Sequence, residues 1–204
     1  MTSYSQPGDG AIERLLTLAG ALGATGVAVI AAAELVVEDR FAAMCAEPHR
    51  CPSYGLAPGC PPHAMRPAEF RRMLRGFRQA LVFKNDAPLA DLQTDKRKDI
   101  ARCIHVIAAT LEHEAIQCGF ACAHGIAAGS CKELFCGDQE SCRFLHRKQP
   151  CPHADQARPS LSALGINFER LAATAGWPFS KPGEQGMPSQ EPVMAMMAGL
   201  VLLA

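Results

Sequence analysis

The last twelve residues, Val193 to Ala204, read VMAMMAGLVLLA and carry no charge. A helix needs about 20 apolar residues to cross a bilayer, so this run is too short to span one. A segment that is apolar on both sides suits a strand whose two faces are covered. We therefore expect the chain to end in a buried strand, with the rest of the fold built around it.

Short apolar runs alternate with amphipathic segments upstream of this strand. Apolar residues recur at helical spacing from Ile12 to Leu22 and again from about Asp95 to Gln117. Further helices are expected from Pro67, from Pro159 to Ala163 and from Phe168 to Ala175, and strands at 27–30, 35–38, 80–83 and 120–126. This alternation predicts an α/β or α+β fold: a single mixed sheet with packed helices and two cysteine-rich metal-binding loops.

The length of 204 residues suits one domain. We expect residues 1–10 to form a flexible tail and residues 11–204 to form a single metal-binding domain. Its ligand loops lie at about 45–67 and 129–159. Residues 86–94 are expected to be a loop and residues 178–192, which are rich in Gly and Pro, a surface excursion.

The charge balance excludes several classes of partner. Twenty basic residues match twenty acidic ones, so the net charge is zero and no bulk field favours nucleic acid or a membrane surface. Leu15 to Ala33 is uncharged, but three glycines interrupt it and no basic segment precedes it, unlike a signal peptide. We expect a cytoplasmic protein with reduced thiols.

The chain has ten cysteines, and their positions divide them. Cys103 and Cys118 lie on the apolar stripe of the expected helix at 95–117, and Cys122 lies in the expected strand at 120–126. In such places a free cysteine behaves as a small hydrophobic residue. The other seven lie in the two irregular stretches: Cys45, Cys51 and Cys60 in the first, and Cys131, Cys136, Cys142 and Cys151 in the second.

The two stretches resemble each other. The first ends CPPHAMRP at 60–67 and the second ends CPHADQARP at 151–159, and each has a further cysteine nine positions upstream of its Cys-Pro. A Pro after a cysteine restricts that cysteine to extended geometry. The pattern predicts two related ligand loops, each leading into a helix.

Thiolates are the soft ligands that hold iron–sulfur clusters, zinc and copper(I). Nearby cations favour thiolate over thiol and would partly neutralise an anionic cluster. The two stretches supply such cations: Arg50, Arg66, Lys132, Arg143, Arg147 and Lys148. A solvated basic face is the alternative interpretation of these residues.

The spacing of the cysteines indicates the kind of metal centre. The chain has no C-x2-C pair, which zinc ribbons usually contain, and neither of the common ferredoxin runs. Wide gaps favour a cluster of the [4Fe–4S] type over a single ion. The second set can supply four ligands. The first supplies three, and its fourth could be His49, His63, Cys122 or an exogenous ligand.

Two blocks carry a resemblance to a known family. They are CPSYGLAPGCPPH at 51–63, and GSC at 129–131 followed by PC at 150–151, ARPS at 157–160 and ALGIN at 163–167. Over roughly residues 34–204 the chain resembles the prokaryotic predicted metal-binding proteins called domain of unknown function 2284. The resemblance implies Cys51, Cys60, Cys131, Cys142 and Cys151 as ligands, with Cys45 and Cys136 in addition, and it implies no particular activity. In the commoner form of the second block the middle cysteines lie closer together than Cys136 and Cys142 do here.

These observations favour one or two iron–sulfur clusters that serve electron transfer or support a partner enzyme. A zinc or copper(I) thiolate module and an enzyme using an open cluster iron are the alternatives. No phosphate-binding, hydrolase or dinucleotide motif is present, and Glu112-His113-Glu114 is interpreted as the solvated face of a helix. We expect a redox or enzyme partner protein, no nucleic acid and no membrane, and leave self-association open.

Overall fold

The computed structural model describes residues 9–179 and 192–204. It contains one four-stranded sheet in the order β1-β2-β4-β3. The strands are β1 (Gly26–Ala31), β2 (Gln79–Pro88), β3 (Ala123–Ile126) and β4 (Met194–Leu203). The larger helices are α1 (Asp9–Ala21), α3 (Pro67–Leu74), α5 (Lys96–Gln117) and α8 (Phe168–Thr174). The short ones are η1 (Ala32–Glu34), α2 (Asp39–Ala43), α4 (Leu89–Leu92), α6 (Cys131–Phe135) and α7 (Arg143–Arg147).

The C-terminal strand β4 is the centre of the fold, as its apolar sequence predicts. It pairs with β2 along ten residues, from Gln79 opposite Leu203 to Pro88 opposite Met194, and with β3 on its other side. Its last six residues are buried. Buried backbone polar groups need hydrogen-bond partners. β2 supplies them along one side of β4, and β3 supplies them on the other side from Leu200 to Leu203.

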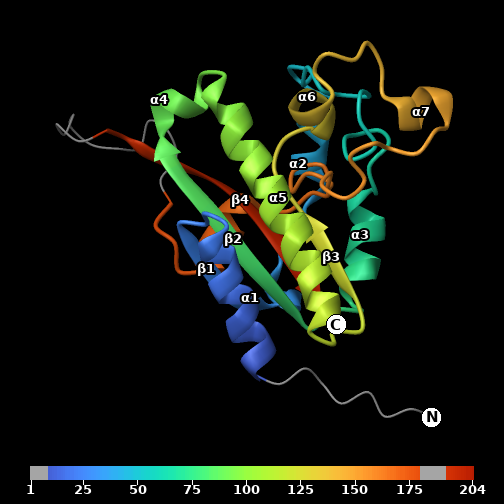
Figure 1. Cartoon of the computed structure of the whole chain (residues 1–204). Helices are drawn as coiled ribbons and strands as arrows, with labels where there is room; N and C mark the ends of the chain where they lie inside the picture. The colour runs from blue at the N-terminus through green and yellow to red at the C-terminus, as the bar shows by residue number, and fades with distance from the viewer. Residues whose placement is uncertain (1–8, 180–191) are drawn as a thin grey trace.

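The α+β class is confirmed, but the expected mixed sheet is wrong, because every neighbouring pair of strands is antiparallel. β2, α5 and β3 form a crossover unit whose two strands run parallel to each other. In an ordinary βαβ unit such strands are neighbours in the sheet. Here β4 lies between them and runs antiparallel to both, so the parallel relation never becomes a hydrogen-bonded pair (Figure 1).

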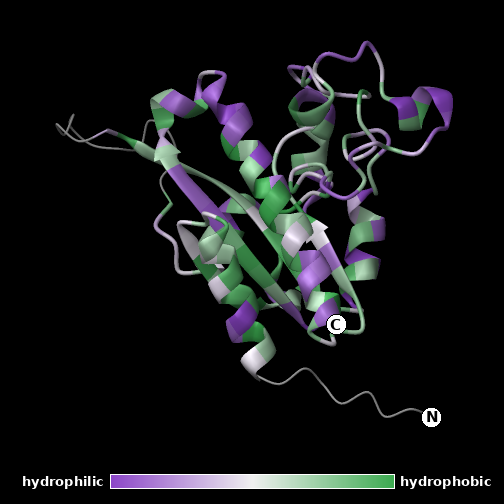
Figure 2. Ribbon diagram, in the orientation of Figure 1, coloured by the Kyte–Doolittle hydropathy of each residue, from purple (hydrophilic) through white to green (hydrophobic). Residues whose placement is uncertain are grey.

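The two faces of the sheet carry separate apolar clusters, because side chains alternate along each strand. On one face Leu81, Phe83 and Val201 pack with residues of α1 and α5. On the other, Val82, Leu200 and neighbours pack with α3, η1 and α8. Green apolar segments follow these strands in Figure 2. In the described part of the chain, no helix is both long and apolar enough to cross a membrane.

Several predicted helix boundaries are confirmed. Pro67 begins α3, whose Phe70 and Leu74 are buried, and Asn167 caps α8 by accepting a hydrogen bond from the Arg170 amide at 3.0 Å. α1 ends just before Gly23, which has a φ of 102°, a left-handed conformation that glycine adopts without strain.

Three predicted elements are wrong. Residues 35–38 are no sheet strand, because Val36 and Val37 pair with the segment around Ile166 instead. Residues 159–163 are no helix, because the Pro159 carbonyl and the Leu161 amide are bonded to Ala127 at the end of β3. Residues 86–88 continue β2, and α4 follows where a loop was expected. Most of the predicted tail at 1–10 and most of the predicted excursion at 178–192 lie outside the described residues, but Asp9 and Gly10 belong to α1.

Gly199 lies in β4, where its neighbours leave almost no space for a side chain. A Cβ there would meet Phe83 Cζ at 2.6 Å, Ile104 Cγ2 at 2.9 Å and the Ile126 carbonyl at 2.9 Å. We expect Gly199→Ala to lower the free energy of unfolding by about 1–3 kcal/mol through overpacking. Gly20→Ala is the control, because nothing lies within 4 Å of its Cβ and alanine favours a helix. Urea unfolding measures both, and equal stabilities would contradict the described packing.

Candidate metal centre

Both cysteine-rich stretches lie beyond the same end of the sheet. In Figure 1 the segment between α2 and α3 runs beside α6 and the loop that carries α7. Backbone contacts join them: the Ser160 amide donates to the Gly59 carbonyl at 3.4 Å, and a Cβ on Gly59 would meet Pro159 Cα at 3.0 Å. A side chain at position 59 would therefore press on the backbone of the second stretch, so the two stretches are in close contact.

The first cysteine set is held by a series of backbone turns. The Cys51 amide donates to the Cys45 carbonyl at 3.0 Å, and the amides of His63 and Ala64 donate to the Cys60 carbonyl. Cys60 is buried, and burial raises the pKa of its thiol, with a smaller contribution from the charge of Cys51. The pKa of Cys45 is raised by burial and then by Cys51 and Cys60. The three thiols therefore lie near enough for each ionised thiolate to disfavour ionisation of its neighbours.

The second set surrounds two short helices. Cys131 begins α6, Cys136 ends it, and Cys142 precedes α7. Burial raises the pKa of the Cys131 thiol to about 12, and Cys60, Cys151, Cys142 and Cys136 add to the shift. The pKa of Cys136 is raised by burial and then by Cys151 and Cys142. Cys131 thus interacts electrostatically with thiols of both sets, so the two sets of predicted ligands adjoin each other.

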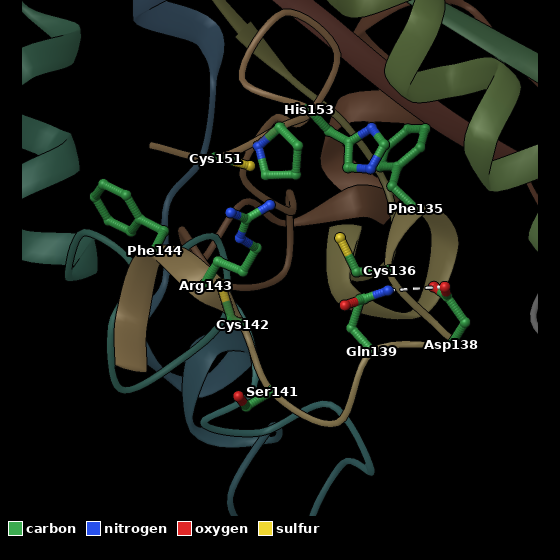
Figure 3. Close-up of a pocket in the computed structure, with 11 residues that line it drawn as sticks. Phe135, Cys136, Asp138, Gln139, Ser141, Cys142, Arg143, Phe144, Cys151 and His153 are labelled. Carbon is green, nitrogen blue, oxygen red and sulfur yellow. Dashed lines mark hydrogen bonds between the residues drawn. The ribbon is translucent and has the colours of Figure 1, made fainter. Parts of the chain in front are cut away.

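A cavity of about 200 Å³ opens among three thiols of the second set, Cys136, Cys142 and Cys151. Figure 3 shows the Cys136 sulfur pointing into this space, with the side chains of Phe135 and His153 beside one another at its edge. Those two rings stack with centroids 5.5 Å apart. Arg143 and Phe144 of α7 also line the cavity. A second cavity, of about 270 Å³, lies where the two stretches meet and is lined by Gly59, Met65, His124, Cys131 and Pro159 among others.

The donors suit a soft metal, but they do not converge on one point. Within residues 9–179 and 192–204, no three His, Cys, Asp or Glu side chains are grouped as a single metal ion requires. A tetrahedral zinc ion holds its sulfur ligands at about 2.3 Å, which brings them into mutual contact. The thiols therefore interact electrostatically but are not arranged as the ligands of a single metal ion.

The remaining three cysteines do not join these groups. Cys103 and Cys118 pack at the edge of the α1–α5 core, which confirms their interpretation as structural residues. Cys122 was expected in the core and is exposed, because β3 begins only at Ala123. Its carbonyl accepts the Ala204 amide at the end of the sheet away from α6 (Figure 1), which argues against Cys122 as a fourth ligand. His49 and His63 are exposed on the first loop.

The predicted cations have different roles. Lys132 donates to the carbonyls of Cys136 and Gln139 at 2.7 and 2.6 Å, and its charge lowers the pKa of Cys136 against the larger upward effects. Arg66 instead pairs with Glu69 at the start of α3, and Arg50 lies over the Tyr54 ring. Arg97 of α5, which we did not single out from the sequence, lies near enough to Cys51 to feel its charge.

Helix α5 supplies a row of polar side chains that hold the second set. Arg97 pairs with Glu133 at 2.6 Å, and Arg102 donates to the Leu134 carbonyl at 2.8 Å, so both grip α6. We did not predict these contacts from the sequence. The side chains of Arg97 and Arg102 are 40% and 43% exposed, so nothing in the helical pattern sets them apart from solvated residues.

Further along α5, two residues hold Arg158, which follows the second loop. His105 Nδ1 accepts the Arg158 amide at 3.0 Å. Glu112 pairs with the Arg158 guanidinium and accepts the Gly125 amide at 2.9 Å. The interpretation of Glu112 as a solvated residue is therefore wrong, whereas His113 is exposed as expected.

His105 is fully buried, and burial lowers its pKa to about 4. The nearby Ala128 and Gln156 carbonyls oppose this shift in part, whereas the Arg158 charge adds to it. The ring lies edge-on to Phe135, with centroids 5.5 Å apart, and Phe135 stacks on His153. A neutral imidazole thus connects the core helix to the edge of the cysteine cavity.

Two thiol-rich loops lie side by side next to an α+β sheet, and thiols are the ligand type that soft metals prefer. The family model described as "Predicted metal-binding protein (DUF2284)" matches residues 28–203, so the chain belongs to this family, as the two sequence blocks predict. No curated protein and no solved structure gives a match to the chain.

His105 gives a prediction about acid stability. Its folded-state pKa of about 4 lies below the unfolded value of 6.5, so the unfolded chain binds the extra proton first as pH falls. The contribution of the neutral ring is complete above pH 6.5 and is lost between there and pH 4. This difference in pKa corresponds to about 3 kcal/mol at most.

We expect His105→Leu to be less stable than the wild type by about 1–3 kcal/mol at pH 7, because the Arg158 amide loses its acceptor. This difference should shrink as the pH falls from 6.5 to 4.5, since only the wild type loses the histidine contribution. Urea unfolding at each pH measures it, with His113→Leu on the exposed face of α5 as control. A stability difference independent of pH would contradict the buried neutral state.

Proposed function

We propose that this protein binds one or two iron–sulfur clusters through the two cysteine loops and uses them for electron transfer. The observation that carries the proposal is the grouping of seven thiols, from loops that are about 90 residues apart in sequence, into two adjoining sets. Cys131 interacts with the other three thiols of the second set, and four cysteines are the ligand number of a [4Fe–4S] cluster.

A cluster is compatible with thiols that are not grouped around one point. A cluster distributes its cysteine ligands over several iron atoms, so the ligands need not touch one another. The described side chains lack a three-donor group for a single ion, yet their thiols interact. When bound, a cluster would supply one-electron chemistry, and Cys131, Cys136, Cys142 and Cys151 would hold it in the second set.

The protein environment would tune such a centre. The Lys132 charge lies beside Cys136, and Arg97 lies near Cys51, so cations face both sets. Positive charge near an anionic cluster stabilises its reduced, more negative state. Thiols that stay reduced until metal binds also require a reducing compartment, which is the reason for placing this function in the cytoplasm.

Anaerobic purification from iron-replete cells should give a brown protein. We expect a broad absorption band near 400 nm, together with iron and acid-labile sulfide in about equal amounts, as [4Fe–4S] clusters contain. Metal analysis, sulfide analysis and electron paramagnetic resonance provide the readouts. Colourless protein with stoichiometric zinc or copper and no sulfide would instead identify a thiolate binding module and overturn the cluster.

Single substitutions should separate ligands from structural cysteines. We expect Cys60→Ser and Cys151→Ser to lose most of the iron of their respective sets, since a serine hydroxyl is a poor ligand for soft metals. Cys103→Ser and Cys118→Ser are matched controls, because these thiols pack at the α1–α5 core. Iron per folded chain, with folding checked by circular dichroism, is the measurement. Full iron content in both Cys60→Ser and Cys151→Ser would reject the two-loop centre.

A further inference from the structure

The most strongly charged surface of the cysteine loops is the segment that carries α7. Residues 141–153 contain Arg143, Arg147 and Lys148 and no acidic residue. All three cations are exposed. Among the contacts of the described residues none of them forms an ion pair, and the Arg143 guanidinium donates only to the Gln149 side chain, at 3.2 and 3.1 Å. In a chain of zero net charge, this is a local excess of three positive charges.

The same segment exposes an aromatic ring. Phe144 is 49% exposed and lies between Arg143 and Arg147 in the short helix α7. In Figure 1 α7 projects from the body of the molecule on the side away from α1 and β1. An exposed aromatic group surrounded by unpaired cations is the composition that protein interfaces favour, in which aromatic and Arg residues supply most of the binding energy.

The position of α7 ties this surface to the candidate centre. Arg143 and Phe144 line the cavity that also contains Cys136, Cys142 and Cys151. In Figure 3 the guanidinium of Arg143 extends over Cys142 toward Cys151. A molecule seated on α7 would therefore lie next to the thiols of the second set.

We propose that the surface formed by Arg143, Phe144, Arg147 and Lys148 is the docking site for an acidic electron-transfer protein. The inference rests on the proposed iron–sulfur function and names its partner class. Opposite charge steers such a partner toward α7 and sets its orientation. One electron then passes between the partner's redox centre and the cluster, so that one is oxidised as the other is reduced and no bond forms or breaks.

Charge complementarity favours an acidic protein over the other anionic partners. The basic segment is one short helical turn, and the acidic residues Asp138, Glu140 and Asp155 flank it in sequence. Such a compact patch suits a matching acidic patch. It would serve poorly for the extended phosphate tracks of nucleic acid or for a membrane plane, which need many cations in a row or on a face.

The test measures binding of a strongly acidic ferredoxin, with a strongly basic cytochrome as the opposite probe. At low salt we expect the wild type to bind the ferredoxin and not the cytochrome, with an affinity that falls as ionic strength rises. The triple variant Arg143→Glu, Arg147→Glu, Lys148→Glu should bind the ferredoxin about tenfold more weakly or worse. Arg78→Glu, an exposed cation at the start of β2, is the matched control and should bind as the wild type does.

The aromatic residue is tested separately from the charges. We expect Phe144→Ala to weaken ferredoxin binding at low and high salt alike, because the lost contact is apolar. Ile116→Ala, which truncates a side chain of similar exposure at the end of α5, is its control. Unchanged folding of all variants is checked by circular dichroism and by iron content.

The outcomes separate the two proposals. Binding of the ferredoxin to the triple variant with wild-type affinity overturns the docking site, as does stronger binding of single-stranded RNA or of vesicles rich in anionic lipid under the same salt. If the purified protein holds no cluster but binds the ferredoxin through these residues, the iron–sulfur function fails and the acidic partner remains. A cluster that is oxidised by the ferredoxin, more slowly in the triple variant, supports both.

Discussion

The ion pair between Glu112 and Arg158 is the interaction on which the arrangement of the cysteine loops depends. Both side chains are largely removed from solvent, at 20% and 14% exposure. Breaking such a pair by removing one partner leaves a charge with little solvation, which costs far more than losing an exposed pair. Since His105 also binds the Arg158 amide, helix α5 holds both the backbone and the side chain of this one residue.

The position of Arg158 also fixes the residues that follow it and their contact with the first cysteine stretch. The next residues, Pro159 to Leu161, bond to Ala127 and prolong the edge of the sheet beyond β3. The same residues contact Gly59, so the exit of the second cysteine stretch supports the first. A loop without regular structure would lose much conformational entropy on ordering. Here contacts at a few fixed points offset that cost. They hold the thiols near one another, although Cys131 is the only one of the seven that lies within a described helix or strand.

The sequence predicted the parts of the fold that depend on local periodicity. The buried strand β4, the long helix α5 and the start of α3 at Pro67 follow from apolar spacing and from proline geometry. It failed where a distant partner decides the conformation. Val36 and Val37 have strand-like side chains but pair with the segment at Ile166, outside the sheet. Likewise, the position of β4 between β2 and β3 depends on tertiary contacts, which no local sequence pattern reveals.

The same distinction applies to the candidate site. Clustering and Cys-Pro repeats were enough to select seven thiols, because ligand type and spacing are local information. Arg97, His105 and Glu112 were missed or misread, because their role lies in contacts with residues between 30 and 60 positions away in sequence. Residues that position a metal centre without touching it carry no motif of their own.

The raised pKa values of the buried thiols give a physical reason why the proposed metal binding would release protons. Burial raises the pKa of Cys131 to about 12, and four further thiols oppose its ionisation, so the group stays neutral without a cation. A metal centre needs these sulfurs as thiolates, so binding must exchange protons for metal charge. Burial of unpaired thiolates would be costly, whereas neutral thiols pack as small apolar groups. In the proposed centre a metal cation would therefore take the place of these protons, while α5 holds Arg158 at the end of the second loop.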